Sequence, residues 1–402
     1  MKILLINQFF YPDPVATSQM MTDLAIDLAA RGHTLTVLTS RSTYLSGESR
    51  LPRSQEYRGI KIYRTFSTNF GKGKTLGRVT DYLSFYLSVF LKALFFKKQD
   101  VVMTLSSPPL IALVGLFLKY LRGHRFCYWV QDLYPEVAVR LGFLTEKSVV
   151  TRVSNQVSKF ILRRADHVVA IGEYMKELLI SKGVSDHHLS VIHNWSDGKE
   201  IYPVKKDENP FVKEHDLSNR FVVLYSGNMG HPHPVKAILE AAKELFWNPR
   251  VLFLFIGDGA RKKEIEAYVK RESLNNVKIL PYQPREMLKF SLSAADAHLV
   301  SLSEGMEGLL VPSKIYGIMA SGRPVIFIGS KKSELGEIIQ NARGGYVVSE
   351  NDSPQLVKYL ALMEHLPDMA KKLGDNNRRA FEQLYDRPLA LQKFESLLNS
   401  LR

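Results

Sequence analysis

Residues 307–325 of this 402-residue chain are Glu307-Gly-Leu-Leu-Val-Pro-Ser-Lys-Ile-Tyr-Gly-Ile-Met-Ala-Ser-Gly-Arg-Pro-Val325. They predict a turn opened by Gly308, a short helix closed by Gly322, and then a strand. The amides of the first helical turn, from Val311 to Lys314, would lack partners within the helix, and the helix dipole adds partial positive charge there. Lys314 adds a full charge. The stretch therefore predicts a binding site for a diphosphate group.

Strand-like runs recur on both sides of this stretch, with helical segments between them. The alternation predicts parallel sheets covered by helices, that is, an α/β fold with two Rossmann-like doubly wound domains. It pauses through Ser190–Gly198 and the charged segment 203–216, which predicts a linker. The runs are Ile3–Ile6, Thr34–Leu38, Ile60–Tyr63, Val101–Leu105, Phe126–Val130 and His167–Ala170, followed by Phe221–Tyr225, Val251–Ile256, Val277–Leu280, His298–Val300, Val325–Ile328 and Tyr346–Val348.

Composition favours a globular protein of the cytoplasm. Hydrophobic residues make up 45% of the chain, enough for a core in each of two domains. The single cysteine, Cys127, lies in an apolar run, so we expect a buried structural thiol and no disulfide within the chain. The first residues, Met1–Asn7, predict a strand rather than a signal peptide, because their apolar run is too short.

The chain carries a formal net charge of +14, from 54 Lys and Arg against 40 Asp and Glu. Such an excess favours anionic partners: nucleotides, acidic lipid surfaces or nucleic acids. No RNA-binding signature or basic zipper accompanies it, so we expect no nucleic-acid partner. No paired-cysteine zinc pattern and no Asp-x-Asp motif in the predicted diphosphate site occur either, and we expect neither a metal nor a cofactor.

Two apolar segments, Tyr82–Phe96 and Leu110–Leu121, are each interrupted by a lysine. Both are shorter than the about 20 residues that a membrane-spanning helix needs. One interpretation packs them as helices on a parallel sheet. The other attaches them to an anionic membrane surface, as a peripheral protein at its inner face, because basic residues lie close by. These basic residues are Lys72, Lys74, Arg78, Lys92, Lys97 and Lys98.

A second glycine turn follows the run Phe221–Tyr225 and contains Gly227, Asn228, Met229 and Gly230. Two glycines at the end of a strand permit close approach of a ligand, although such a turn alone also occurs without one. The next residues, His231-Pro-His-Pro234, predict a rigid turn or histidine contacts to phosphate.

Two segments of the first half are candidates for the acceptor side. Tyr11 and the small residues Ala16, Thr17 and Ser18 connect the first strand to a helix, where a ligand would meet the helix N-terminus; capping of that helix is the alternative for Thr17 or Ser18. The carboxylates of Asp132 and Glu136 follow another strand end. They are suited to orienting or deprotonating a hydroxyl group, while Asp132 could instead cap the helix beginning near Pro135.

Taken together, these motifs resemble the glycosyltransferase family 4 group of the GT-B fold, which assembles bacterial surface polysaccharides of the colanic acid and exopolysaccharide type. The resemblance extends over nearly the whole chain and includes a subgroup with a Pro-Ser-Lys donor motif. The matching segments are Lys2–Pro14, Val130–Glu136, Val191–Trp195, Tyr225–Gly230, Phe255–Gly259 and Pro312–Tyr316.

The resemblance implies two domains facing across a cleft: residues 1–197 for the acceptor, residues 198–378 for a nucleoside diphosphate sugar, and a final segment, 379–402, crossing back to the first domain. It implies transfer of a sugar to a saccharide or polyprenyl-linked acceptor with retention of anomeric configuration. Asp132 and Glu136 would be catalytic. The donor would contact Gly227, Asn228, Met229, Gly230, Glu307, Gly308, Leu309, Leu310, Val311, Ser313 and Lys314.

The chain also departs from the family pattern. Many members carry two glutamates with seven residues between them, and alignment on Met319–Gly322 places Leu309 and Gly317 at those positions. Glu307 is the nearest replacement for the sugar contact. Gln131 replaces a histidine common in the family, and Asn228 lies where basic residues are frequent. Two alternatives therefore stay open: a catalytically silent nucleotide-sugar-binding subunit, or a sugar-nucleotide epimerase of the same fold.

Overall fold

The computed structural model of the protein describes residues 1–43, 51–68, 70 and 75–402. It consists of two units, which are described separately. Unit 1 comprises Met1–His193, Gly308–Leu310 and Ala390–Arg402, and unit 2 comprises Asn194–Glu307 and Val311–Leu389. The sequence placed these boundaries after residues 197 and 378. Unit 2 ends at Leu389 rather than at residue 378, because its helix Pro367–Leu384 continues past the predicted boundary.

Unit 1 contains an eight-stranded sheet in the order β3-β4-β2-β1-β5-β6-β7-β8. Its strands are parallel except for β3, which pairs antiparallel with β4 at the edge. Each predicted run of the first half overlaps a strand. The strands β3 and β8 were not predicted, and β8 lies where the sequence indicated the start of a linker. The bounds are β1 Lys2–Ile6, β2 Thr34–Ser40, β3 Ser54–Tyr57, β4 Ile60–Thr65, β5 Val101–Leu105, β6 Arg125–Trp129, β7 His167–Ala170 and β8 Leu189–Val191.

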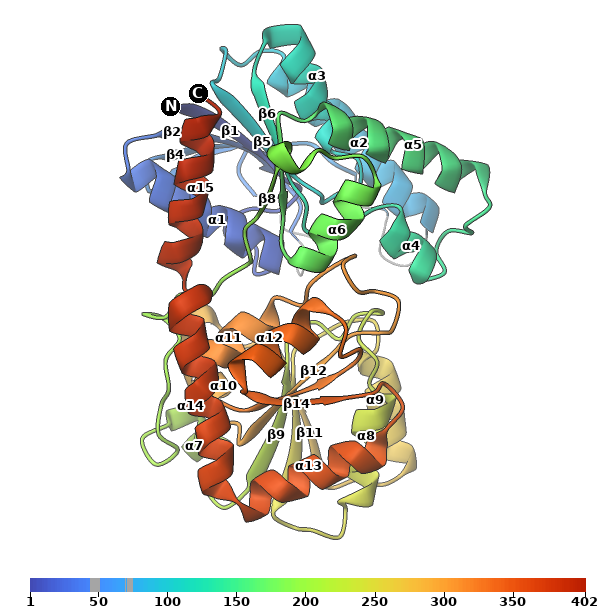
Figure 1. Ribbon diagram of the computed structural model, residues 1–402, viewed down its shortest axis with the longest axis vertical. Coiled ribbons are helices and arrows are strands. Elements are labelled where there is room, and N and C mark those ends of the chain that lie inside the picture. The colour runs from blue at the N-terminus through green and yellow to red at the C-terminus, as the bar shows by residue number, and fades with distance from the viewer. Residues whose placement is uncertain (44–50, 69, 71–74) are drawn as a thin grey trace. The chain divides into compact units, whose positions relative to one another are not determined.

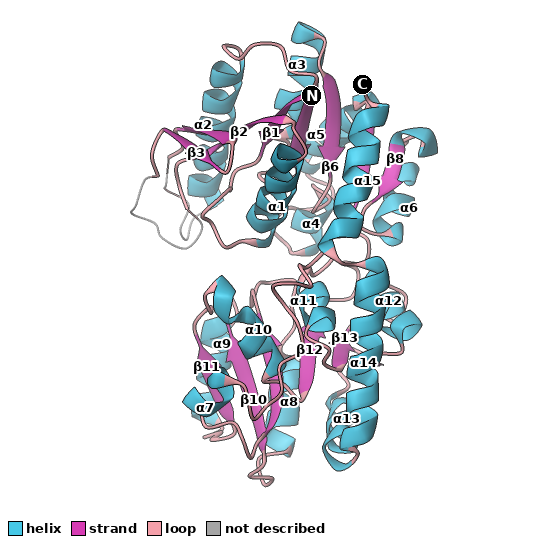
Figure 2. Ribbon diagram, turned by 90° about the vertical axis from the view of Figure 1, so that its left-hand side faces the viewer, coloured by secondary structure: helices cyan, strands magenta, loops and turns pink. Residues whose placement is uncertain are grey.

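Helices cover both faces of this sheet. Figure 1 shows α1 and α15 on one side and α2, α3, α5 and α6 on the other, and Figure 2 shows α1 and α15 in front. Central strands such as β5 are buried along their whole length, as expected for a sheet covered on both faces. The helices are α1 Ala16–Ala30, α2 Thr75–Ala93, α3 Ala112–Arg122, α4 Glu136–Arg140, α5 Val149–Arg164, α6 Glu173–Ser181, the short η1 Asp186–His188 and α15 Arg387–Ser400, which enters unit 1 at Ala390.

The helix α15 packs within unit 1 through an aromatic contact. The ring of Phe394 lies 4.7 Å from that of Trp129 at the end of β6, and both side chains are fully buried. Glu395 pairs with Arg31, which follows α1. The last residues of the chain are therefore part of the core of unit 1.

The two apolar segments form α2 and α3. Both pack on the sheet: Phe85 and Val89 of α2 and Val114 and Leu118 of α3 join a core cluster with strand residues. Within the described part of the chain, no helix has the length and hydropathy needed to cross a membrane. Lys72 and Lys74 lie outside the described residues. The prediction that these helices pack on a sheet is confirmed.

Unit 2 contains a six-stranded parallel sheet in the order β11-β10-β9-β12-β13-β14, and each predicted run of the second half is a strand of it. Figure 1 shows α8, α9 and α13 on one side and α10, α11 and α12 on the other. The strands are β9 Phe221–Ser226, β10 Val251–Ile256, β11 Val277–Leu280, β12 Ala297–Ser301, β13 Val325–Ile328 and β14 Gly345–Val348. The helices are α7 Pro210–Glu214, α8 Lys236–Glu244, α9 Lys262–Arg271, the short η2 Arg285–Met287, α10 Leu288–Ser293, α11 Lys314–Ala320, α12 Glu334–Ala342, α13 Ser353–His365 and α14 Pro367–Leu384.

Alternate residues of the central strands fill two different cores. Val223 and Tyr225 of β9 join the cluster that contains α8 and α13, whereas Val222 and Leu224 join the cluster that contains α7. This division follows from the two-residue period of a strand. The fold class predicted from the sequence, α/β with two doubly wound domains, is confirmed.

One buried side chain connects α14 to the sheet of unit 2. The Nδ2 group of Asn377 donates to the carbonyl oxygens of Arg323 at 2.9 Å and Gly344 at 2.7 Å, and the side chain is fully buried. Asn377→Ala would leave two buried carbonyl groups without these donors. We expect a loss of about 2 to 4 kcal/mol in the free energy of unfolding, measured by urea denaturation. Asn376→Ala is the control; its side chain makes one exposed hydrogen bond to Arg343, and an equal loss there would contradict this assignment.

Candidate functional site

Lys314, the first residue of α11, lies beside the glycine turn that follows β9. Its Nζ is 3.4 Å from the carbonyl oxygen of Asn228 and 3.8 Å from the centre of the Tyr225 ring. A Cβ atom at Gly227 would lie 3.3 Å from Lys314 Cε. The structure thus brings together two features that lie more than 80 residues apart and were predicted independently. All of these residues belong to unit 2.

This group of residues lies at the point of the sheet where strand order reverses. From β9 the chain continues outward to β10 and β11, and then crosses to β12 on the other side of β9. Ligands of open parallel sheets bind outside the carboxyl ends of the strands at such a switch point. Gly227 directly follows the carboxyl end of β9. Its position, rather than the Gly-x-x-Gly pattern alone, makes this turn a candidate ligand site.

A second glycine turn supports the first one. Gly257 follows β10 with φ of 138°, and a Cβ atom there would lie 2.2 Å from the carbonyl oxygen of Gly227. The Met229 amide donates to the carbonyl oxygen of Asp258 at 2.8 Å. Only glycine permits this backbone contact, because any side chain at residue 257 would overlap the first turn. The second turn therefore fixes the backbone beside Lys314.

Lys314 is a partly buried residue. Burial lowers the pKa of Lys314 to about 7, because desolvation disfavours the charged form. The face of the Tyr225 ring offers a weak partner for a cation. An incoming anion would restore the full charge, so the site is suited to a phosphate or diphosphate group.

The neighbouring histidines differ in their surroundings. The Nδ1 atom of His233 is 2.6 Å from the carbonyl oxygen of Ser301, and burial lowers the pKa of His233 to about 3. His233 is therefore a neutral side chain that links the turn to the end of β12. His231 is exposed, and its carbonyl oxygen accepts a hydrogen bond from Arg261 at 3.1 Å. A contact between phosphate and either His231 or His233 stays a prediction.

Three residues expected on the donor side lie in unit 1. Gly308 has φ of 71°, and a Cβ atom there would lie 2.7 Å from the carbonyl oxygen of Tyr174, so glycine is required by contact with α6. The Leu309 carbonyl oxygen accepts from the Leu133 amide at 2.8 Å, and Leu310 pairs with Asp132 in an isolated β-bridge. Backbone pairing, not an open turn, thus fixes these residues, and their donor contacts stay a prediction.

The remaining donor-side residues of this stretch are in unit 2. Ser313 is the N-cap residue of α11 but makes no side-chain capping hydrogen bond. Val311 is buried, whereas Glu307 is partly exposed. The helix begins at Lys314, three residues later than the predicted first turn. The positive charge at this turn therefore comes mainly from the Lys314 side chain, and less from free backbone amides at the start of the helix.

Asp132 and Glu136 have different environments. The backbone amide of Asp132 donates to Ser106 Oγ at 2.9 Å, and burial of its carboxyl group raises its pKa to about 6. The N-cap of α4 is Pro135, without a side-chain hydrogen bond, so the capping alternative for Asp132 is wrong. Glu136 forms an ion pair with Lys182, whose Nζ also donates to Asn155 at 2.9 Å. This pair favours a structural role for Glu136.

The remaining acceptor-side residues surround the start of α1. The helix begins at Ala16 after the N-cap residue Val15, which makes no side-chain capping bond, so capping by Thr17 or Ser18 is wrong. Ser18 is fully buried, and its hydroxyl has no hydrogen-bond partner among the described residues. Tyr11 stacks on Tyr57 with ring centres 3.8 Å apart. The interpretation of Cys127 agrees with the structure: it is buried, and burial raises its pKa to about 12.

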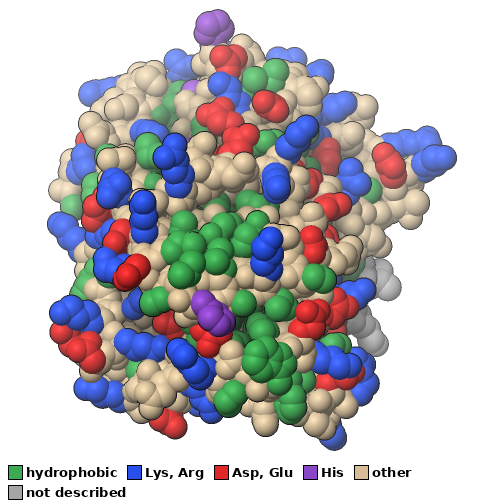
Figure 3. All heavy atoms as spheres, turned by 60° about the horizontal axis from the view of Figure 1, so that its bottom comes forward, with side chains coloured by type: hydrophobic (Ala, Val, Ile, Leu, Met, Phe, Trp, Pro, Cys, Tyr) green, Lys and Arg blue, Asp and Glu red, His purple; other side chains and the backbone are tan. Residues whose placement is uncertain are grey.

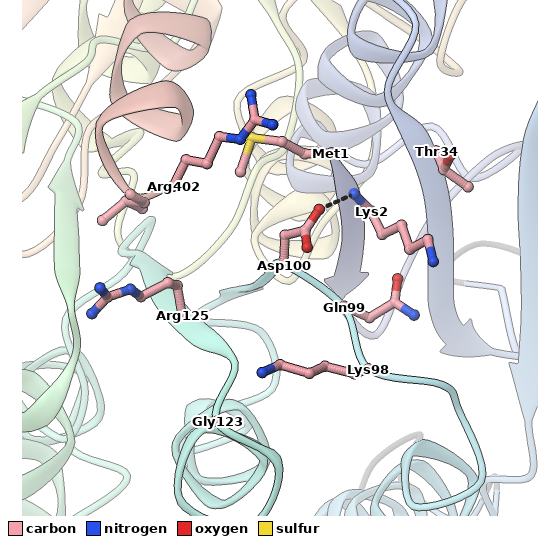
Figure 4. Close-up of a pocket in the computed structure, with 10 residues that line it drawn as sticks. Met1, Lys2, Thr34, Lys98, Gln99, Asp100, Gly123, Arg125 and Arg402 are labelled. Carbon is pink, nitrogen blue, oxygen red and sulfur yellow. Dashed lines mark hydrogen bonds between the residues drawn. The ribbon is translucent and has the colours of Figure 1, made fainter.

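A cavity of about 520 Å³ lies in unit 1, at the amino ends of the strands. Figure 4 shows Lys2, Lys98, Arg125 and Arg402 around it, together with Asp100, whose Oδ2 accepts from the Lys2 amide at 2.7 Å. Ligands of this sheet type bind at the opposite edge. The cavity is therefore not the predicted acceptor site.

Tyr225 is the residue of the Lys314 site that the sequence did not indicate. It is the last apolar residue of β9 before the glycine turn, and it is almost fully buried. An aromatic residue at this place usually belongs to the core, so no local signal separates the two roles. Only the fold shows that its ring lies under Lys314.

Comparison with known proteins identifies the family. The profile described as "Glycosyl transferases group 1" matches residues 206–380, and "Glycosyl transferase 4-like domain" matches residues 16–195. A Pseudomonas aeruginosa protein, the probable glycosyltransferase WbjE, is 30% identical over 306 residues, which are 76% of each chain. The chain belongs to the group 1 glycosyltransferases. It is thus a glycosyltransferase, as the sequence predicted.

Further relatives agree with this assignment. WcaI of Escherichia coli, provisionally named a colanic acid biosynthesis glycosyl transferase, is 27% identical over 366 residues, 88% of this chain and 89% of its own. Sucrose-phosphate synthase from Thermosynechococcus elongatus superposes with a TM-score of 0.80 at 20% identity, covering 100% of this chain and 99% of its own. Anabaena HepE in complex with UDP-glucose gives 0.76 at 16% identity with full coverage of both chains. These structures establish the GT-B fold of this glycosyltransferase.

Proposed function

We propose that this glycosyltransferase transfers a sugar from a nucleoside diphosphate sugar to a saccharide or polyprenyl-linked acceptor in the synthesis of a cell-surface polysaccharide. The main support for this proposal is the position of Lys314. Its Nζ lies 3.4 Å from the carbonyl oxygen of Asn228, at the switch point of the unit 2 sheet. A partly buried cation beside a glycine turn neutralises the charge that develops on a departing diphosphate. The proposal includes no metal ion and no organic cofactor.

Uracil is the first base to test, because HepE has been crystallised with UDP and with UDP-glucose. The relative WcaI supports an acceptor in surface polysaccharide synthesis through its name. We also propose that the chain belongs to the subgroup with a Pro-Ser-Lys donor motif, because it contains Pro312-Ser313-Lys314. Transfer with retention of configuration is part of the proposal, as is a location at the cytoplasmic face of the membrane.

In this proposal Asp132 acts on the acceptor hydroxyl and Glu136 does not. The pKa of Asp132, raised to about 6, is closer to neutral pH than that of an ordinary carboxyl group, which suits a group that accepts a proton. Glu136 is held by Lys182. Glu307, at the end of its unit 2 segment, is proposed as the sugar contact in place of the glutamate pair that this chain lacks.

A thermal-shift series tests the donor proposal. We expect UDP-glucose or another nucleoside diphosphate sugar to raise the melting temperature, because a ligand at 100 times its Kd adds about 2.7 kcal/mol to stability. The series contains UDP, GDP, ADP and TDP, each with and without common sugars attached. A shift with one base identifies the donor class. A chain that none of these ligands stabilises would contradict the proposal.

A further inference from the structure

Helix α2 exposes a continuous apolar stripe to solvent. Val79, Leu83, Leu87, Leu91 and Phe95 recur every fourth residue along the helix and just beyond its end, and they are 47%, 61%, 61%, 49% and 85% exposed. Residues four apart lie on one face of a helix. The opposite face of α2 is buried against the sheet. Packing within unit 1 therefore does not account for the outer stripe.

The stripe continues across two neighbouring helices. The ring of Phe117 in α3 lies 4.7 Å from that of Phe90 in α2, and Lys119 of α3 donates to the Arg164 carbonyl oxygen at the end of α5 at 2.8 Å. α3, α5 and the residues that bound them also expose large apolar side chains, each at least 41% accessible. They are Leu113, Phe117, Tyr120 and Leu121, and Val149, Val150, Val153 and Phe160. We call the exposed surface of α2, α3 and α5 the apolar face.

The charge of these three helices is almost entirely of one sign. Their sequences contain a single acidic residue, Asp81, whose carboxylate accepts from Thr68 Oγ1 at 2.7 Å and from the Phe70 amide at 2.9 Å. Apolar side chains interspersed with lysine and arginine are typical of helices that lie in the headgroup region of an anionic bilayer. The basic residues with described side chains are Lys92, Lys119, Arg122, Arg152, Lys159, Arg163 and Arg164, of which Lys119 also pairs with Asp166 at 3.0 Å.

Two other surfaces of the described chain differ from the apolar face. The helices on the other side of the same sheet, α1 and α15, expose no large hydrophobic side chain among the described residues. On the face of the molecule shown in Figure 3, hydrophobic side chains gather in a patch, but Asp and Glu lie around it together with Lys and Arg. Neither of these two surfaces combines exposed large apolar side chains with charge of one sign, as α2, α3 and α5 do.

We infer that the apolar face docks unit 1 on a lipid bilayer that contains anionic lipids. The inference rests on the proposed function only in giving this docking a purpose, delivery of a lipid-linked acceptor. The apolar stripe enters the headgroup boundary, and the lysines and arginines contact lipid phosphates. Since the helices also pack on the sheet, the chain lies on the membrane without crossing it.

Vesicle flotation tests this docking. Wild-type protein is expected to float with vesicles of phosphatidylcholine and 30% phosphatidylglycerol at low salt, and to float poorly with pure phosphatidylcholine. The double variant Leu87→Glu and Leu91→Glu should bind the anionic vesicles about tenfold less well or worse, because two carboxylates replace apolar contacts. Arg152→Glu with Lys159→Glu should weaken binding similarly and reduce its dependence on salt.

A matched control places the same change on unit 2. Leu366 and Leu384 are 49% and 56% exposed, close to the exposure of Leu91 and Leu87, and the double variant with glutamate at both should float like wild type. Unchanged binding by the Leu87 and Leu91 variant would overturn the inference. So would a concentration-dependent dimer, in sedimentation velocity, that the same variant dissociates, because a second copy would then cover the face.

Donor binding separates this inference from the proposed function. The Leu87 and Leu91 variant should keep the melting temperature of the wild type and its shift with the nucleoside diphosphate sugar. Loss of flotation with an intact donor shift therefore supports the docking surface alone. An intact donor shift in a wild-type protein that binds no vesicle would overturn the docking surface and leave the donor proposal standing.

Discussion

Lys314→Ala is expected to lower kcat/KM by about 10- to 150-fold, which corresponds to the about 1.5 to 3 kcal/mol of a charge-assisted contact. The side chain lies against the Gly227–Gly230 turn, so its loss leaves the diphosphate with no full positive charge at that position. The measurement is initial-rate kinetics with the donor identified by thermal shift. Because the charge matters most as the nucleotide departs, we expect kcat to fall as well as KM to rise.

Proton linkage gives this prediction a second readout. The pKa of Lys314 is lowered to about 7 in the free protein, and a bound diphosphate favours the protonated form. Donor binding therefore takes up a proton above pH 7, and the Kd of a nucleoside diphosphate sugar should weaken by up to about tenfold per pH unit there. Below pH 7 the lysine is already charged, so the Kd should level off.

One control variant changes a lysine elsewhere in unit 2. Lys236→Ala removes an exposed lysine of α8 that pairs only with Glu240 at 3.8 Å, and it should leave kinetics and pH dependence unchanged. Lys314→Ala itself should abolish the pH dependence of Kd. A kcat/KM within about twofold of wild type would remove Lys314 from the donor site.

Asp132→Asn is expected to lower kcat by about 100- to 10,000-fold, the range of general acid–base catalysis. The substitution keeps the shape and partial burial of the side chain but removes its ability to accept a proton. The pKa of Asp132, raised to about 6 by burial, also predicts a pH profile. The active carboxylate is lost as pH falls through 6, so kcat/KM should decline about tenfold per unit below it.

Glu136→Gln is the matched control for Asp132. It breaks the ion pair with Lys182, a lysine whose side chain is only 8% exposed, so we expect a loss of about 1 to 3 kcal/mol in stability and kcat within a few fold of wild type. An equal loss of kcat in both variants would return Glu136 to the catalytic role predicted from the sequence. Unchanged kcat in Asp132→Asn would show that Asp132 does not take the proton of the acceptor hydroxyl.

Much of the fold could be predicted from the sequence because its central strands are buried on both faces. Runs such as Val251–Ile256 are apolar throughout, and the spacing of the runs leaves room for one covering helix each. The edge strand β3 and the three-residue β8 escaped prediction. Ser54–Tyr57 is polar because it lies at the sheet edge, and Leu189–Val191 is too short for a periodic pattern.

The candidate site could be predicted only in part. Lys314 and the Gly227–Gly230 turn were predicted from local backbone chemistry, and the fold brings them together. Local chemistry also suggested an open phosphate turn at Gly308, but that glycine is required by contact with the backbone of Tyr174. A glycine turn can thus form either a ligand site or a close backbone contact. Only long-range packing distinguishes these two roles. Tyr225 and the Glu136–Lys182 pair depend on such packing too.

Sugar transfer can be followed in one mass-spectrometric experiment with the stabilising nucleoside diphosphate sugar and a lipid-linked saccharide extract from bacteria that make a surface polysaccharide. We predict that wild-type protein releases nucleoside diphosphate and glycosylates the acceptor in equal amounts, and that Lys314→Ala forms both products more slowly by the same factor. An isomerised nucleotide sugar with an unchanged acceptor, or a donor that binds but stays intact with every extract, would contradict the proposed transferase activity.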